Sequence, residues 1–429
     1  MLVKSRAART LLSLFVPGGV LLVAALLLAH VPAAHVTAPY AASFLLWTAL
    51  VAALVMAWRF QSSRVVFGVV VLFLADRGLI ILSHASPHSA SIAFGLLAFL
   101  IPLNLIFFSV IGESGLTLPS IGSGIGIVAV QAIAVAMLAR PENIEFARWV
   151  RHAYLPRELF SWTPLPQFAL LAFAAAIAWL GMRMSLLRKP VDTAFFWASC
   201  AAFAGLNSAS PGGASSLYLA TGVLAFGAAL VETSYLLAFH DELTGLPGRR
   251  AFNQELLALE DTYSIAMVDV DHFKRFNDTF GHDTGDQVLR MVAWRLAQVG
   301  GGGRTFRFGG EEFAIVFPAR SAPDCLDHLE EIRQAIARAS FMVRGPDRSQ
   351  RRRGERRYTK PGRRPVGSAR TRTAVTVSMG VAESSARLNT PERVIEAADQ
   401  ALYRAKDNGR NRVEHAGAVR RPQAVGTNP

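Results

Sequence analysis

The sequence predicts a bundle of membrane-spanning α-helices followed by a water-soluble α/β domain. The chain of 429 residues is 52% hydrophobic and only 17% charged, which is too apolar for an ordinary soluble protein. Residues 1–237 hold 13 Lys and Arg and 7 Asp and Glu, whereas residues 238–429 hold 31 and 24. Strand-like and helix-like segments alternate only in the second half. We therefore expect a membrane domain at 1–237, a soluble domain at 238–415 and a disordered tail at 416–429.

A helix that crosses a bilayer needs about 20 predominantly apolar residues. Eight runs fit this length, and the two at 117–138 and 191–209 are the weakest because they contain Gly, Ser or Asn. The runs lie at 10–30, 40–58, 65–83, 92–111, 117–138, 166–185, 191–209 and 214–237. A signal peptide is the alternative for the first run, but the many runs that follow are not targeting segments. We expect about eight transmembrane helices.

Positive charges in short loops indicate the orientation of these helices. Basic residues precede the first run and occupy the loops after the second and sixth runs, whereas the loops at 31–39, 84–91 and 210–213 have no Lys or Arg. This pattern places both ends of the bundle on the cytoplasmic side. The loop at 139–165 is an exception, since it carries four arginines on the expected outer side; it is either an amphipathic surface helix or a plain connection.

Two charged residues, Asp76 and Arg77, lie inside the third run. Charges within a membrane are costly and often functional; the alternative is that these residues lie nearer the outer interface and pair with a neighbouring helix. No cofactor motif is recognisable in residues 1–237. We expect this half to be sensory, with an unidentified stimulus ligand.

The soluble half alternates strands and helices. Residues 263–273 read as an apolar strand that ends in Asp269 and Asp271, and residues 304–317 read as a hairpin around a Gly-Gly turn. Helical spacing is present at 283–299 and 322–339, and a further strand at 373–383. The last helix is expected to begin after Thr390 and to stop at Gly409.

Two carboxylates at neighbouring strand ends, Asp269 and Glu311, suit a hard divalent cation with phosphate oxygens. Gly309 and Gly310 would allow a ligand to approach the backbone closely, because they lack a Cβ. Three cations are candidates for the phosphate groups: Lys274, Lys406 and Arg410. Each feature alone is weak, but together they indicate a nucleoside triphosphate site.

Five segments in the same order make the soluble half resemble the GGDEF family of diguanylate cyclases. They are "DELTGLPGRR", "DVDHFKRFNDTFGHDTGD", "RFGGEEF", "VTVSMGVA" and "ADQALYRAKDNGRNRV". The resemblance covers about residues 238–415. It implies a palm-like domain, similar to nucleotide cyclases, with a mostly antiparallel sheet and flanking helices. It also implies condensation of two GTP into cyclic di-GMP and two pyrophosphates.

The resemblance assigns roles to individual residues. Asp269 and Glu311 match the metal ligands, assisted by the carbonyl of Val270, and the ion would be Mg2+ or Mn2+. Glu312 matches the second catalytic carboxylate, so the signature reads GGEEF, and Gly309 and Gly310 are its glycines. The remaining matches are Asn277 and Asp286 for the guanine edge, and Phe273, Lys274, Lys406 and Arg410 for the triphosphate.

The implied product has two-fold symmetry and each domain holds one GTP, so a homodimer is expected. The family resemblance and the charge pattern together predict a multi-pass protein of the bacterial cytoplasmic (inner) membrane that acts in second-messenger signalling. The alternative is a catalytically silent domain that serves as a receptor or scaffold for GTP or cyclic di-GMP. Retention of the glycines and the acidic pair of the signature favours the enzyme.

Two departures from the family pattern stand out. The family's product-inhibition motif, RxxD, would place Arg and Asp at positions that here are Gly300 and Gly303, so this feedback site is expected to be absent. An insertion at 344–372 carries 12 Lys and Arg against 2 Asp and Glu. It could contact anionic membrane lipid or be a solvated extension; we expect no specific nucleic-acid partner, because Tyr358 is its only aromatic residue.

Overall fold

The computed structural model describes residues 14–30, 34–84, 86–113, 115–140, 142–143, 152, 154–208, 213–260, 262–344 and 370–417. The expected tail therefore lies outside the described residues except for 416 and 417, as does the insertion between 345 and 369. The chain divides into two compact units, Met1–Tyr235 and Leu236–Pro429. Each unit is described separately.

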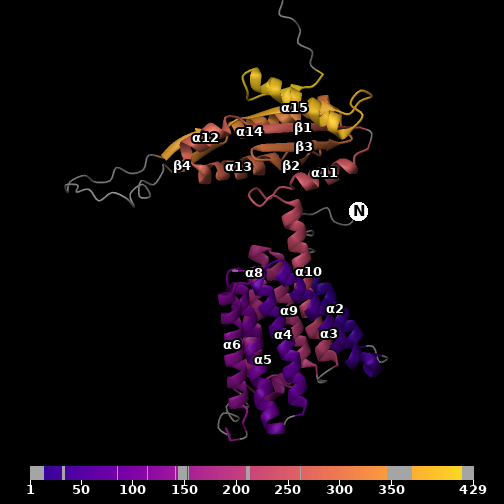
Figure 1. The fold of residues 1–429 in the computed structure, drawn as a ribbon, viewed down its shortest axis with the longest axis vertical. Coiled ribbons are helices and arrows are strands. Elements are labelled where there is room, and N and C mark those ends of the chain that lie inside the picture. The colour runs from indigo at the N-terminus through magenta and orange to yellow at the C-terminus, as the bar shows by residue number, and fades with distance from the viewer. Residues whose placement is uncertain are drawn as a thin grey trace, which may run out of the picture. The chain divides into compact units, whose positions relative to one another are not determined.

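The first unit is entirely helical in its described part (Figure 1). Its elements are α2 (Gly18–Ala29), α3 (Ala34–Arg59), α4 (Ser63–Ser83), α5 (Pro87–Val110), α6 (Leu118–Leu138), the short 3-10 helix η1 (Arg157–Phe160), α8 (Gln167–Leu187), α9 (Pro190–Asn207) and α10 (Ala214–Phe239). Of these, α3, α4, α5, α6, α8 and α10 are long and apolar enough to cross a membrane. Helix α2 spans only 12 described residues, and α9 spans 18 with Asp192 in its first turn. All eight expected runs are thus helices, and six of them meet the criterion for spanning.

The core of this unit lies between α3, α4, α5, α8, α9 and α10, and aromatic pairs such as Phe67 with Phe108 and Phe195 with Phe226 join the helices. Asp76 is fully buried, pairs with Arg77 and accepts a hydrogen bond from Ser216 of α10. The carboxylate of Asp76 is therefore buried and bonded to a neighbouring helix, whereas the side chain of Arg77 is 29% exposed.

The second unit contains a five-stranded sheet in the order β2-β3-β1-β6-β7. Its strands are β1 (Tyr263–Val270), β2 (Arg304–Gly309), β3 (Glu312–Pro318), β6 (Val377–Glu383) and β7 (Val413–His415), and only the β6–β7 pair is parallel. Its helices are α11 (Arg249–Leu257), α12 (Phe273–Phe280), α13 (His282–Leu296), α14 (Ala322–Ala337) and α15 (Pro391–Asp407). The mostly antiparallel sheet with flanking helices confirms the predicted class.

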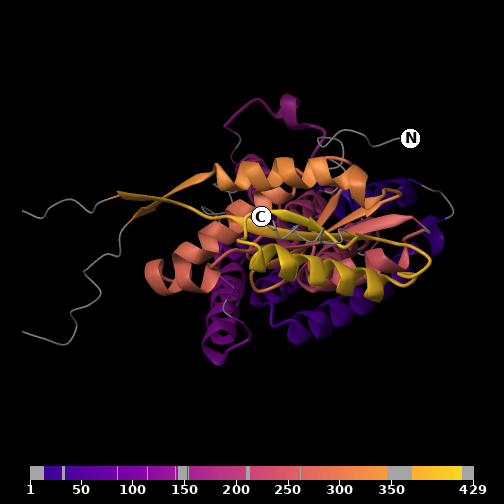
Figure 2. The same cartoon turned by 90° about the horizontal axis from the view of Figure 1, so that it is seen from above.

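The central strand β1 is buried along its whole length, and its successive side chains point to opposite faces of the sheet. Ala266, Val268 and Val270 pack with α12, α13 and α14, whereas Ile265 and Met267 pack with α11 and α15. Figure 2 shows α14 and α15 on opposite sides of the strands. Side chains alternate between the faces of a strand, so Asp269 belongs to the α15 face.

A separate two-stranded ribbon, β4 (Ser340–Arg344) with β5 (Arg370–Ala374), flanks the basic insertion. The first residue and the last three residues of the predicted insertion are therefore strand residues. The segment between them is outside the described part, so its lipid contact stays a prediction.

Candidate active site

Three carboxylates, those of Asp269, Glu311 and Glu312, meet at the end of β1, and we call this cluster the carboxylate corner. Asp269 lies opposite Glu312 in the antiparallel β1–β3 pair, and opposite residues of such a pair point to the same face. The amide of Val270 donates a hydrogen bond to the carbonyl of Glu311 at 3.3 Å, which holds the turn of the β2–β3 hairpin beside β1. The hairpin and the central strand thus bring both glutamates of the signature next to Asp269.

One cation lies among these carboxylates. The Nζ atom of Lys406 in α15 is 3.0 Å from Oδ2 of Asp269. Asp269 is only 6% exposed, and this burial raises its pKa despite the attraction of Lys406, while Glu312 raises it further. Burial also raises the pKa of Glu311, and the neighbouring charge of Asp269 adds to the effect. The site therefore holds more negative charge than its own lysine neutralises.

This excess charge fits a divalent cation. Two carboxylates, Asp269 and Glu311, and the carbonyl of Val270 are hard oxygen donors of the kind that Mg2+ prefers. Within the described ranges no group of three or more His, Cys, Asp and Glu side chains is arranged to hold a metal ion. A metal here would thus depend on the backbone carbonyl and on oxygens from a substrate, as the predicted ligand set implies.

Asp399 is a fourth acidic residue near the carboxylate corner, and it was not predicted from the sequence. It lies on α15 two turns before Lys406, and reduced hydration together with the charge of Glu312 raises its pKa. Its spacing of seven residues from Lys406 places both on one face of the helix, a signal that could have identified it.

Asp271 has a different role from Asp269, although only two residues separate them. Its carboxylate accepts hydrogen bonds from Thr376 Oγ1 at 2.6 Å, from Ser378 Oγ at 2.7 Å and from the amide of Asn411 at 3.1 Å. The last bond anchors the turn after α15, where Arg410 has a left-handed backbone (φ 62°). Asp271 thus fixes the turn that carries Arg410, one of the predicted phosphate cations.

Arg307 joins the turn of the signature to the start of the unit. Its Nη1 atom donates to Asp241 at 2.6 Å, and its Nε and Nη2 atoms donate to the carbonyl of Gly310 at 3.2 and 2.7 Å. Hydrogen bonds from Thr244 and Arg307 lower the pKa of Asp241, although burial opposes them. The segment "DELTGL" that follows α10 is therefore linked directly to the "GGEEF" turn.

The predicted guanine-reading pair lies at the junction of α12 and α13. Oδ1 of Asn277 is buried and has no hydrogen-bond partner among the described residues, and a Cβ on Gly285 would lie only 1.8 Å from it. Asp286 follows Gly285 and is half-buried. The glycine thus makes room for an amide oxygen that is buried without a hydrogen-bond partner among the described residues.

The predicted triphosphate contacts differ in how they can act. The ring of Phe273 belongs to the hydrophobic core, so only its backbone at the start of α12 can meet a ligand. Lys274 is exposed in the same turn. Gly309 and Gly310 lie at the hairpin turn, and a Cβ on Gly310 would meet no atom within 4 Å, which leaves the approach to the turn open.

The glycine run before β2 is closely packed. A Cβ on Gly300 would lie 2.8 Å from Nδ1 of His328, and one on Gly303 would lie 2.7 Å from the ring of Phe317. Such distances are too short for real Cβ contacts. The positions where the family's feedback motif carries Arg and Asp therefore have no room for side chains without rearrangement.

Comparison with known proteins places this site in a family. Residues 238–355 and 351–412 match the family model for the diguanylate cyclase GGDEF domain. Response regulator PleD of Caulobacter vibrioides is 35% identical over 191 residues, which are 43% of this chain and 37% of PleD. Diguanylate cyclase VdcA of Vibrio cholerae is 37% identical over 180 residues, which are 41% of this chain and 46% of VdcA. The chain thus spans less than half the length of these relatives.

A solved structure also matches the second unit. The GGDEF domain of DgcB from Caulobacter crescentus, crystallised with c-di-GMP, shares 37% sequence identity over 42% of this chain and 97% of its own, with a TM-score of 0.35. The family model covers the part of the sequence that contains the carboxylate corner. Residues 238–412 of this chain are therefore a GGDEF domain with diguanylate cyclases among its relatives.

Proposed function

We propose that the chain is a membrane-bound diguanylate cyclase that condenses two GTP into cyclic di-GMP and two pyrophosphates. The observation that carries this proposal is the corner where Asp269, Glu311 and Glu312 meet beside Lys406. A degenerate, silent domain would not need to keep a buried Asp269 beside two glutamates, where burial and neighbouring charge raise the pKa of Asp269 and Glu311.

The residues of the site can divide the chemistry among them. Asp269, Glu311 and the carbonyl of Val270 would hold Mg2+ or Mn2+, which would lower the pKa of the attacking ribose hydroxyl and offset charge on the leaving pyrophosphate. Lys406 already lies within the carboxylate corner, so it can neutralise phosphate oxygens there. Glu312, on the same face as Asp269, is positioned to accept a proton near the reacting groups.

Base recognition would lie at the α12–α13 junction. Guanine presents two neighbouring donors, N1–H and the amino group, and Asp286 together with the buried Oδ1 of Asn277 offers acceptors for them. Adenine lacks this donor pair. We therefore propose GTP rather than ATP as the substrate.

Membrane attachment and dimerisation complete the proposal. Six helices of the first unit are long and apolar enough to span a membrane, and α10 continues without interruption from residue 214 to residue 239 at the start of the GGDEF domain. We propose that two chains meet in the cytoplasmic membrane of a bacterium, since a two-fold symmetric product requires two substrate-loaded domains. The first unit would then regulate how these domains meet.

The test is product formation from GTP and Mg2+ by full-length protein in lipid nanodiscs. Glu311→Gln and Asp269→Asn should each lower turnover at least about 100-fold, because a lost metal interaction is worth several kcal/mol. Glu396→Gln, which removes one exposed charge elsewhere on α15, is the matched control and should keep wild-type turnover. Binding of GTP or cyclic di-GMP without any turnover by the wild-type protein would support the receptor alternative instead.

A further inference from the structure

A cavity of about 600 Å³ lies within the first unit, between α4, α5 and α6. Ligand sites in proteins typically have volumes of about 300–1,000 Å³. Helix α6 contributes Val128, Gln131, Ala132, Val135 and Ala136 to the lining, and Ala139 and Arg140, which follow the helix, also line it. The α6 residues are spaced by three and four positions, which is one face of a helix, so this face of α6 borders the cavity.

The sequence explains why α6 stands away from α4 and α5. At Gly124 the helices approach so closely that an added Cβ would lie 2.0 Å from the ring of Phe67. Towards the other end of α6, Val135 and Leu138 pack against Ile92 and Leu96. Ala132 lies between these two contacts and Ala136 lies within the second, and both side chains are too short to fill the space. The cavity is therefore a consequence of the α6 sequence.

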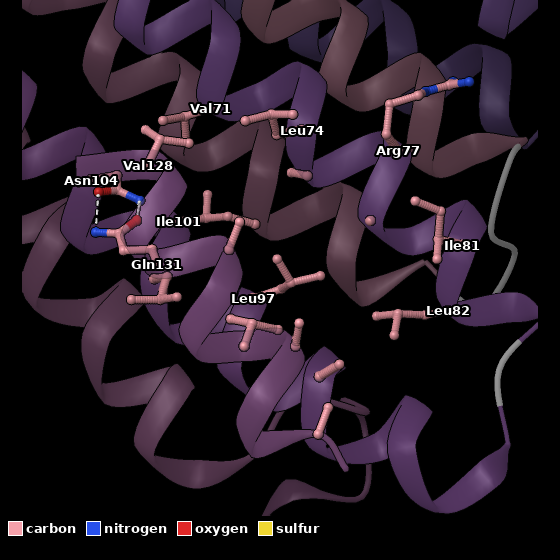
Figure 3. A pocket seen from close by; sticks show the side chains of 18 of the residues that line it. Val71, Leu74, Arg77, Ile81, Leu82, Leu97, Ile101, Asn104, Val128 and Gln131 are labelled. Atoms are coloured by element: carbon pink, nitrogen blue, oxygen red, sulfur yellow. Dashed lines mark hydrogen bonds between the residues drawn. The ribbon is translucent and has the colours of Figure 1, made fainter. Parts of the chain in front are cut away.

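The cavity lining is mostly apolar, and its polar residues are Arg77, Ser89, Arg140 and one pair of amides. Figure 3 shows the two amides facing each other at one end. Nδ2 of Asn104 donates to Oε1 of Gln131 at 2.8 Å, and Nε2 of Gln131 donates to Oδ1 of Asn104 at 3.0 Å. Asn104 is only 7% exposed. Each amide has two N–H groups and two lone pairs on its oxygen, so the mutual pair uses half of this capacity.

Two charged residues, Arg77 and Arg140, belong to the wall; Arg140 follows the end of α6, nine residues after Gln131, and Arg77 is engaged elsewhere. In Figure 3 the side chain of Arg77 lies away from the amide pair, and its guanidinium pairs with Asp76 and lies over the rings of Trp47 and Phe73. An ionised head group next to the amides would thus have no counter-charge, and burial of an unpaired charge is very costly. A neutral hydrogen-bonding group has no such penalty.

We propose that this cavity binds a membrane-dissolved, single-chain lipid with an uncharged hydrogen-bonding head group. The head group exchanges hydrogen bonds with Asn104 and Gln131, and the chain lies along the apolar face of α6. The remaining N–H and lone pair of each amide suit a group that both donates and accepts, such as an alcohol. This inference concerns the first unit alone and does not depend on the proposed cyclase activity.

The test uses the full chain in phosphatidylcholine nanodiscs and a photoreactive, clickable C16 alcohol. Labelled peptides should come from α4, α5 and α6. Unlabelled hexadecanol should compete about 3- to 10-fold better than hexadecane, which is the ratio expected for one net hydrogen bond. Gln131→Leu should remove this preference. Equal competition by the alcohol and the alkane in the wild-type protein would overturn the role of the amide pair.

Two matched variants locate the site. Ala132→Phe fills the cavity and should abolish labelling of the cavity-lining peptides, whereas Ala134→Phe places the same ring on an exposed part of α6 that does not line the cavity and should leave labelling unchanged. Labelling that persists in Ala132→Phe, or that is spread equally over exposed residues of α3, would show general lipid contact and refute the proposal.

Discussion

The contact between Arg307 and the signature turn gives a sharp prediction. Replacement of Arg307 by Lys keeps the charge but cannot keep three hydrogen bonds to two different acceptors. Asp241 retains its bonds from the amide and hydroxyl of Thr244, so the main loss falls on the carbonyl of Gly310. The turn that leads to both glutamates of the signature would then lose its attachment to the segment that follows α10.

The magnitude follows from the geometry. A hydrogen bond to a charged group contributes about 1.5–3 kcal/mol, and Lys can replace at most one of the three. The Arg307 and Asp241 side chains are 13% and 24% exposed, so water compensates part of the loss. We expect a decrease of about 2 kcal/mol in the free energy of unfolding, and thus a Tm about 4–8 °C lower for a domain of this size. A displaced turn should lower kcat about tenfold or more.

Arg304→Lys is the matched control, because Arg304 lies on the same strand and pairs with Glu255 while 59% exposed. Such exposed pairs contribute little to stability. The assays are thermal unfolding of the fragment from residue 236 and turnover of full-length protein in nanodiscs. Our reasoning fails if Arg307→Lys keeps wild-type Tm and kcat, or if Arg304→Lys loses as much of either.

Three further predictions concern the same unit. Cyclic di-GMP should inhibit turnover weakly, because Gly300 and Gly303 replace the family's feedback residues; strong noncompetitive inhibition in a product-titration assay would contradict this. Gly380→Ala should destabilise the domain by about 3 kcal/mol, since its Cβ would lie 2.0 Å from the Leu402 amide nitrogen in α15; an unchanged urea midpoint would refute it. Burial raises the pKa of Asp269 and Glu311, so protons compete with Mg2+ for these two carboxylates. The Mg2+ concentration that gives half-maximal turnover should therefore fall as pH rises above about 4. A raised pKa means that the folded state binds protons more tightly than the unfolded state in this range, so ionisation at higher pH lowers the stability of the metal-free fold. Asp269→Asn should therefore raise Tm at neutral pH in the presence of a chelator, and a lower Tm would count against the assigned cause.

Local signals predicted much of the second unit. The hairpin of β2 and β3 was predicted from alternation around two glycines, and its turn comprises Gly310 and Glu311. Thr390 caps α15 by accepting a hydrogen bond from the amide of Arg393, and the helix ends at Asp407, two residues before Gly409. These features depend on neighbours in sequence, which is why pattern and capping rules could identify them.

Features that depend on distant residues could not be predicted in this way. The link from Arg307 to Asp241 joins residues 66 positions apart, and nothing in either segment alone specifies its partner. The cavity of the first unit depends on the spacing between α4 and α6, which is set by one close contact at Gly124 and by the side chains beyond it. Hydrophobic runs indicate which segments are helices, but they do not indicate where two helices separate.

The pair Asp269 and Asp271 shows how structure divides a motif that the sequence presents as uniform. Asp269 is in β1, whereas Asp271 follows the end of that strand and bonds to Ser378, the residue paired with Asp269 in the β1–β6 ladder. Asp271 has three donors with good geometry and is therefore satisfied as an anion without any ligand. Asp269 has a single lysine and two acidic neighbours, and burial raises its pKa. Only the carboxylate of Asp269 has excess negative charge around it that a bound cation would offset. The number of hydrogen-bond donors, rather than position in the sequence, therefore separates the candidate metal ligand from the residue that holds the fold.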